Sequence, residues 1–174
     1  AASVRGSLEA ALTPWMAGTN SDPLRYDATW GGVVSNSGGS FNQGAYNDHH
    51  FHYGYFLYAA AALAKEDAGW LAEWGDEVDQ ILRNIANPTP ADPHYTVARN
   101  KDWFVGHSWA QGLYTGGDGR NQESSSEAVN AWYGVYLWGV ATGDERVRDL
   151  DRLLLAMELR SAHTYYQITS DSGI

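Results

Sequence analysis

Two kinds of helix-forming segment alternate along this chain, and their alternation restricts the fold more than any other feature. Residues 48–65 and 123–141 are rich in small and aromatic residues and are apolar on nearly every face, as in a helix buried all round. Residues 70–86 and 145–162 instead space their apolar side chains three and four apart, with polar residues opposite. The order predicts pairs of helices in which an outer member shields an inner one from water.

This order predicts an all-α fold that forms part of a toroid of helical hairpins. A complete toroid of six hairpins, the (α/α)6 barrel, needs about twelve helices of about 11 to 12 residues plus their connections. The chain has 174 residues, which is too few. We therefore expect residues 1–174 to form a partial barrel with long loops, which often carry function.

The N-terminal part of the chain predicts one broken helix and a loop. Residues 4–17 read as a helix interrupted at Pro14, because proline lacks a backbone donor and clashes with the preceding turn. Residues 18–45 are rich in glycine, asparagine and serine, which favours a loop around a short strand at 30–34.

Composition excludes several classes of protein. The net charge of -10 disfavours nucleic acid and anionic membranes, and no apolar run reaches the roughly 20 residues of a membrane helix. Without cysteine there is neither a disulfide framework nor a thiolate metal site. The chain starts without methionine or a signal peptide, which suggests a mature or excised segment. Its 8 tryptophans and 11 tyrosines suit carbohydrate, because their rings offer both apolar and polar surface.

The segment "YNDHHFHYGY" places ionisable side chains where a buried helix is expected to begin. In a helix Asp48 and His52 share a face, and Tyr55 continues the same stripe. The helix dipole favours the carboxylate form of Asp48, whereas burial favours the protonated form that a general acid needs. Capping of the helix by Asn47 or Asp48 is an equally simple interpretation and stays open.

The three histidines of this segment make a weak metal pattern. Metal-binding pairs on a helix are usually four residues apart, and only Asp48 and His52 meet that spacing. Hydrogen-bonded packing of His49, His50 and His52 explains the cluster better, so we expect no metal ligand here.

A second acidic pair occurs in "NQESSSEAVN". If the helix starts at Glu123, then Glu123 and Glu127 lie one turn apart, and their repulsion favours protonation of one of them. A solvated first turn that meets the helix dipole is the alternative. The apolar residues that follow offer no basic partner, which favours an inner helix. The motifs "WGG", "DWF" and "GHSW" would bring tryptophans to the rim of a cleft, and paired acids with such an approach suggest glycoside hydrolysis.

Four long motifs then carry a specific resemblance. "DPLRYDATWGGVVS", "YNDHHFHYGYFLYAAA", "DWFVGHSWAQGL" and "DGRNQESSSEAVNAWYGVYLWG" occur in this order, and the chain resembles glycoside hydrolase family 81 over residues 12–162. The resemblance implies endo-acting hydrolysis of 1,3-β-glucan with inversion of anomeric configuration, on an (α/α)6 barrel. It also implies that the family's N-terminal β-sandwich, its linking domain and the remaining barrel helices lie outside residues 1–174.

The resemblance also implies roles for individual residues. Asp48 matches the general acid, and Glu127 is the favoured general base, with Glu123 as a neighbour that positions water or sugar; the order of the two glutamates stays open. The expected sugar contacts are His52, Tyr55, Trp30, Asp102, Trp103, His107, Trp109, Asn121 and Asn130. Ser124 to Ser126 lack the Gly-x-Ser-x-Gly turn of a nucleophile.

The remaining expectations concern partners and location. No cofactor or metal is expected, and the partner is 1,3-β-glucan, with no nucleic acid and no membrane. The family resemblance and the polymeric substrate imply an extracellular, monomeric full-length enzyme. The competing interpretations are a non-catalytic glucan-binding module, an inactive fragment of the barrel and a helical interaction scaffold.

Overall fold

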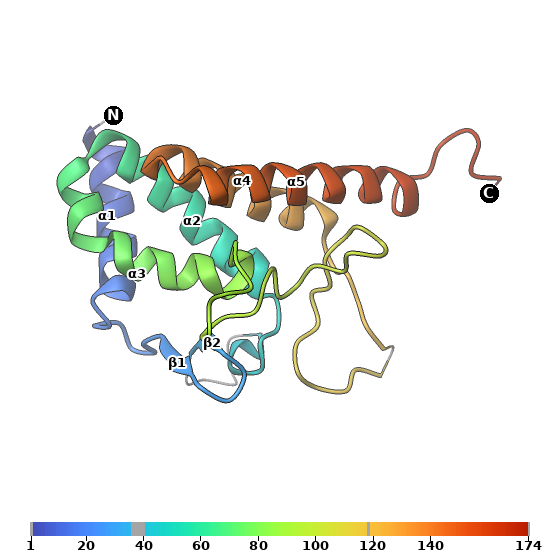
Figure 1. Ribbon diagram of the computed structural model, residues 1–174, viewed down its shortest axis with the longest axis horizontal. Coiled ribbons are helices and arrows are strands. Elements are labelled where there is room, and N and C mark those ends of the chain that lie inside the picture. Colours follow the sequence, from blue (N-terminus) through green and yellow to red (C-terminus); the bar gives the residue numbers. More distant parts are fainter. Residues whose placement is uncertain (1, 36–40, 118, 174) are drawn as a thin grey trace.

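The computed structural model describes residues 2–35, 41–117 and 119–173 (Figure 1). Residues 36–40 of the expected 18–45 loop lie outside these ranges. The helices are α1 (Ala2–Met16), α2 (His49–Glu66), α3 (Ala68–Ala86), α4 (Ser125–Thr142) and α5 (Glu145–Tyr165). A 3-10 turn η1 (Gln43–Ala45) precedes α2, and β1 (Arg25–Asp27) pairs antiparallel with β2 (Gly32–Val34).

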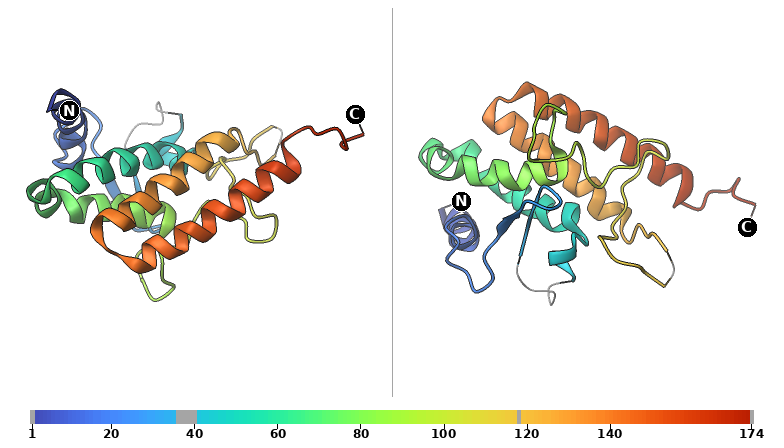
Figure 2. Two further views of the ribbon diagram at one scale, coloured as in Figure 1. Left: turned by 90° about the horizontal axis from the view of Figure 1, so that it is seen from above. Right: turned by 60° about the horizontal axis from the view of Figure 1, so that its bottom comes forward.

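The inner pair of helices is α2 and α4, which pack along one another. Helix α3 covers α2, and α5 covers α4. Helix α1 packs against α2 and α3 at one end of the molecule (Figures 1 and 2). The prediction of an all-α fragment built from inner and outer helices is therefore confirmed. Within the described residues no helix combines the length and the apolar character needed to cross a bilayer.

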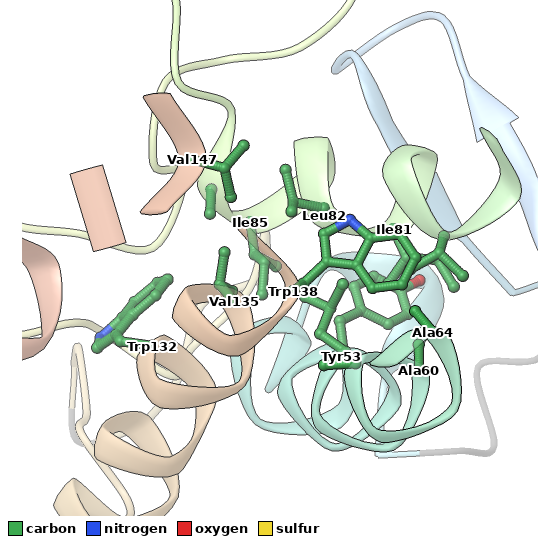
Figure 3. Close-up of a cluster of buried hydrophobic side chains, with 14 of the residues drawn as sticks. Tyr53, Ala60, Ala64, Ile81, Leu82, Ile85, Trp132, Val135, Trp138 and Val147 are labelled. Carbon is green, nitrogen blue, oxygen red and sulfur yellow. The ribbon is translucent and has the colours of Figure 1, made fainter. Parts of the chain in front are cut away.

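The core lies where α2, α3 and α4 meet, with α5 closing one side (Figure 3). Trp138 of α4 faces Tyr53, Ala60 and Ala64 of α2. Val135 of α4 lies beside Ile85. The other core residues labelled are Ile81, Leu82 and Ile85 of α3, Trp132 of α4 and Val147 of α5. Trp138 also donates a hydrogen bond of 2.8 Å from its indole nitrogen to Asp79 of α3, which ties the two hairpins together.

Glycine permits the close approach of the two inner helices. A Cβ atom on Gly54 would lie 2.5 Å from the Cα of Ala131, and one on Gly134 would lie 2.7 Å from the carbonyl oxygen of Gly54. Both contacts are with backbone or with a short side chain, so no flexible group can yield. The spacing of α2 and α4 therefore depends on these two glycines.

Replacing Gly54 by alanine is expected to lower the free energy of unfolding by about 1–3 kcal/mol, because the inner helices must move apart. The matched control is Gly6→Ala in α1, where an added Cβ meets nothing within 4 Å. That change is expected to raise stability by about 0.5–1 kcal/mol through helix propensity. Urea unfolding of both variants measures the difference; equal effects would contradict the close packing of α2 on α4.

Several sequence expectations about element boundaries were wrong. Helix α1 is not interrupted at Pro14 and continues to Met16. Pro14 lies in the last turn, where one missing donor matters little, and the amide of Ala17 still bonds to the carbonyl of Thr13. The strand expected at 30–34 covers only Gly32–Val34, and its partner β1 was not predicted.

The start of α4 also differs from the prediction. The helix begins at Ser125 rather than at Glu123, because the side chain of Ser124 accepts a hydrogen bond from the amide of Glu127 and caps the helix. Glu123 therefore precedes the helix. Its expected position one helical turn from Glu127 was wrong.

Candidate active site

The candidate site lies where the N-terminal turns of α2 and α4 meet. The hydroxyl of Tyr55 on α2 donates a hydrogen bond of 2.9 Å to Oε1 of Glu127 on α4. This hydrogen bond raises the pKa of Tyr55 and fixes one oxygen of Glu127. Residues far apart in the sequence are thus joined directly across the inner helices.

Asp48 occupies the position before α2 but does not cap it. Its backbone is left-handed, with φ 55 and ψ 18, and its side chain accepts no hydrogen bond from the helix. The amide of Asp48 donates instead to the carbonyl of Ala110 at 2.9 Å, which holds the chain in this turn. The capping interpretation was therefore wrong for Asp48, and also for Asn47, whose side chain contacts Phe41, Asp48, Gly112 and Tyr114.

The carboxyl group of Asp48 is buried and favours its protonated form. The residue is 6% exposed. Burial, together with the smaller effects of the negative charges of Glu123 and Glu127, raises the pKa of Asp48 to about 6. The sequence left open whether burial or the helix dipole decides the protonation of Asp48. Burial and the repulsion from Glu123 and Glu127 outweigh the dipole and favour the protonated form. Asp48 holds a proton in the pH range where an ordinary aspartate has lost it.

His52 and Glu123 complete the group around Asp48. Burial lowers the pKa of His52, against the opposing effect of Glu127 and Glu123, and so favours the uncharged imidazole. Its ring packs against Phe41 with the ring centres 5.8 Å apart. Glu123 lies before α4, yet it acts electrostatically on both Asp48 and His52. The structure thus brings together Asp48, His52, Tyr55, Glu123 and Glu127.

The long loop between α3 and α4 forms a separate cavity of about 510 Å³. Asp102 organises one wall: its Oδ2 accepts a hydrogen bond of 3.0 Å from the indole of Trp109, and its Oδ1 accepts from the amide of Phe104. Trp103 and Trp109 line this cavity, whereas Asp48, Glu123 and Glu127 do not. The two tryptophans therefore line a cavity separate from the acids, and their role as sugar platforms stays a prediction.

The other expected sugar contacts occupy different environments. Trp30 is 55% exposed in the turn before β2, and its carbonyl accepts from Arg99. His107 is 5% exposed and packs against Trp109 and Tyr166, which makes it a support of the loop. Asn121 is exposed, and its carbonyl accepts from the amide of Ala110.

Asn130 is half-buried on α4, one turn beyond Glu127. Its side-chain nitrogen is buried and lacks a hydrogen-bond partner among the described residues. The amide therefore lies on the same stretch of α4 as Glu127 with one donor unused.

Glu158 of α5 is a residue that sequence reasoning missed. It is fully buried and paired with Lys101, with Nζ and Oε2 2.9 Å apart. The same carboxylate also accepts from the amide and hydroxyl of Ser108, from Gln122 and from the indole of Trp132. The only signal in the sequence for the burial of Glu158 was its spacing of four residues from Leu154, which places it on the apolar face of α5. Glu158 therefore fixes the middle of the long loop, at Lys101 and Ser108, and its C-terminal end, at Gln122, to α4 and α5.

The histidines beside the acid pack in the core. His49 contacts the carbonyl of Gln43 at 2.7 Å and the side chain of Asn84 at 2.8 Å. His50 stacks on Trp132 with ring centres 5.8 Å apart, and burial lowers its pKa to about 3. Among the described residues, no three His, Cys, Asp or Glu side chains are grouped closely enough to hold a metal ion.

Comparison with known proteins agrees with this description. The family model for the Glycosyl hydrolase family 81 C-terminal domain matches residues 1–174. A glucan endo-1,3-beta-D-glucosidase of Acetivibrio thermocellus is 39% identical over 164 residues, covering 91% of this chain and 21% of that protein. The primary septum glucan endo-1,3-beta-D-glucosidase of Schizosaccharomyces pombe is 39% identical over 178 residues, covering 96% of this chain and 17% of that protein.

A solved structure gives the same result. It is a glycoside hydrolase family 81 protein from Clostridium thermocellum, in a mutant with alanine in place of a glutamate. The match has a TM-score of 0.77 and 41% identity, and it covers 86% of this chain and 22% of that chain. The present chain thus spans about a fifth of the length of these relatives.

A carboxyl group with a raised pKa, placed beside two further acids where two paired helices begin, is typical of a glycoside hydrolase. The resemblance seen in the sequence motifs points to the same class of enzyme. Within that class, the chain belongs to glycosyl hydrolase family 81 and corresponds to its C-terminal domain.

Proposed function

We propose that this chain carries the acid and base groups for endo-hydrolysis of 1,3-β-D-glucosidic bonds, with inversion of anomeric configuration. The observation that carries the proposal is the buried carboxyl group of Asp48, whose pKa is about 6 beside Glu123 and Glu127. The relatives named as glucan endo-1,3-beta-D-glucosidases supply the substrate class.

The roles follow from what each group can do chemically. Asp48 acts as general acid and protonates the departing glycosidic oxygen, while Glu127 acts as general base and removes a proton from water on the opposite face of the sugar. Tyr55 donates to Oε1 of Glu127, which leaves Oε2 to accept the proton from water. Glu123 orients this water or the sugar and raises the pKa of Asp48 by its charge.

The proposal also covers the setting of the chain. Residues 1–174 act as part of a catalytic helical barrel, and the rest of a full-length family protein supplies the β-sandwich, the linking domain and the remaining barrel helices. The enzyme acts outside the cell as a monomer on laminarin-type 1,3-β-glucan. Its sugar contacts include His52, Trp103 and Trp109.

Replacing Glu127 by glutamine is expected to abolish hydrolysis while glucan affinity is retained, because glutamine keeps the hydrogen bond from Tyr55 but cannot take a proton. A loss of about 10²–10⁴-fold in rate is expected. Reducing-sugar assays and affinity electrophoresis in linear 1,3-β-glucan measure the two quantities. Unchanged turnover would remove Glu127 as the base.

A non-catalytic glucan-binding module is the second candidate. The specific observation in its favour is the cavity of about 510 Å³ lined by Trp103 and Trp109, which the acids do not line. The same assays separate the two functions. Glucan affinity that depends on the tryptophans, without hydrolysis by the parent chain, would favour binding alone.

A further inference from the structure

Asn47 has an amide group whose orientation is defined by its four neighbours. Its Nδ2 donates to the carbonyl of Phe41 at 3.0 Å and to Oδ2 of Asp48 at 2.8 Å. Its Oδ1 accepts from the amide of Gly112 at 3.3 Å and from the hydroxyl of Tyr114 at 2.8 Å. A carbonyl can only accept and a backbone amide can only donate. The reversed orientation of the Asn47 side chain would therefore lose the hydrogen bonds to the carbonyl of Phe41 and from the amide of Gly112.

This arrangement distinguishes the two oxygens of the acid. Oδ2 of Asp48 faces an N–H donor, so a proton placed on Oδ2 would compete with that donor. Oδ1 is buried and has no hydrogen-bond partner among the described residues. The proton of the neutral carboxyl group therefore belongs on Oδ1, where it competes with no donor.

The loop segment that holds Asn47 is packed tightly against it. A Cβ atom on Gly112 would lie 2.0 Å from the carbonyl oxygen of Ala45 and 2.5 Å from the amide nitrogen of Asn47. The amide of Leu113 adds a hydrogen bond of 2.6 Å to the same carbonyl of Ala45. Because these contacts are between backbones, the loop cannot shift without moving the residues that precede Asp48.

We propose that Asn47 is a positioning residue, held by Tyr114, which holds Asp48 by Oδ2 and thereby assigns its acidic proton to Oδ1. The assignment rests on the proposed function of Asp48 as general acid. The charged groups that act on Asp48 are Glu123 and Glu127 at the start of α4, and both disfavour the carboxylate. The hydrogen bond from Asn47 acts in the opposite direction, since it stabilises the carboxylate.

The sign of the expected change follows. Removing the Asn47 donor removes a stabiliser of the carboxylate, so the pKa of Asp48 must rise above its value of about 6. Activity that requires protonated Asp48 is lost as pH rises through this pKa. The alkaline limb of the pH–rate profile therefore moves upward in Asn47→Ala.

The test is the ¹³C titration of the Asp48 carboxyl carbon, assigned with the Asp48→Asn variant. Asn47→Ala is expected to raise the midpoint by about one pH unit, and Tyr114→Phe by a smaller amount. The control Tyr165→Phe removes the hydroxyl of a tyrosine that is 63% exposed and is expected to leave the midpoint unchanged. Tyr114→Phe keeps the test available if Asn47→Ala does not fold.

An unmoved midpoint in a folded Asn47→Ala protein, or in Tyr114→Phe if that variant alone folds, would overturn the proposal. The titration needs no turnover, so it also separates this proposal from the proposed function. A raised midpoint together with an alkaline limb that moves equally would support both. A raised midpoint without hydrolysis by any variant would support the role of Asn47 and overturn the function of Asp48 as a glycosidase acid.

Discussion

Asp48→Asn is expected to lower kcat for hydrolysis of linear 1,3-β-glucan by about 10²–10⁴-fold, the usual contribution of general acid catalysis. Asparagine has the same shape as aspartate and still accepts the hydrogen bond from Asn47, but it cannot protonate a departing oxygen. Because the side chain of Asp48 does not cap α2, the fold should survive the change. Initial rates of reducing-sugar release measure the effect, with circular dichroism as the check on folding.

A second substrate makes this test specific for an acid. An aryl 1,3-β-glucooligosaccharide with an acidic phenol as leaving group departs without protonation, so Asp48→Asn should retain far more of its activity on it. Equal losses on both substrates would show that Asp48 acts by binding or packing. Unchanged rates on linear glucan would contradict any catalytic role.

Glu158→Ala is expected to lower the free energy of unfolding by about 3–5 kcal/mol, because it leaves the fully buried ammonium of Lys101 without its partner. It also removes the acceptor for the backbone and hydroxyl of Ser108, for Gln122 and for the indole of Trp132. Guanidinium unfolding followed by tryptophan fluorescence measures the change. The loss of these anchors should also weaken glucan affinity, since they hold the loop that carries Trp103 and Trp109.

The matched control for this prediction is Glu145→Ala. Glu145 pairs with Arg148 at 3.3 Å, but its side chain is 77% exposed, so its removal should change stability by no more than about 1 kcal/mol. The double variant Lys101→Met with Glu158→Leu should recover part of the loss, because no buried charge remains. A Glu158→Ala protein as stable as the control would contradict the anchoring role of this carboxylate.

The helix pattern could be read from the sequence because burial acts on each helix as a whole. Helices α2 and α4 are apolar on nearly every face, and they are the inner pair. The start of α4 was misplaced because acidic residues and serine both favour a first turn, and only the hydrogen bond from Glu127 to Ser124 decides between them. Strand β1 could not be predicted because its sequence has no alternation of apolar and polar residues. It is recognised as a strand only through its pairing with β2.

The candidate site was only partly predictable for a related reason. The stripe of Asp48, His52 and Tyr55 follows from helical spacing, which is local. The left-handed turn at Asp48 depends on the carbonyl of Ala110, and the orientation of Asn47 depends on Gly112 and Tyr114. These contacts join segments that are distant in sequence, and no local pattern encodes them.

The most direct test of the central claim is the anomeric form of the first sugar released from linear 1,3-β-glucan by this chain, followed by ¹H NMR before mutarotation. A buried acid at Asp48 acting with Glu127 on the opposite face of the sugar predicts that the α-anomer appears first. Early release of the β-anomer would contradict inversion and these paired roles, and glucan that is bound but never cleaved would contradict hydrolysis itself.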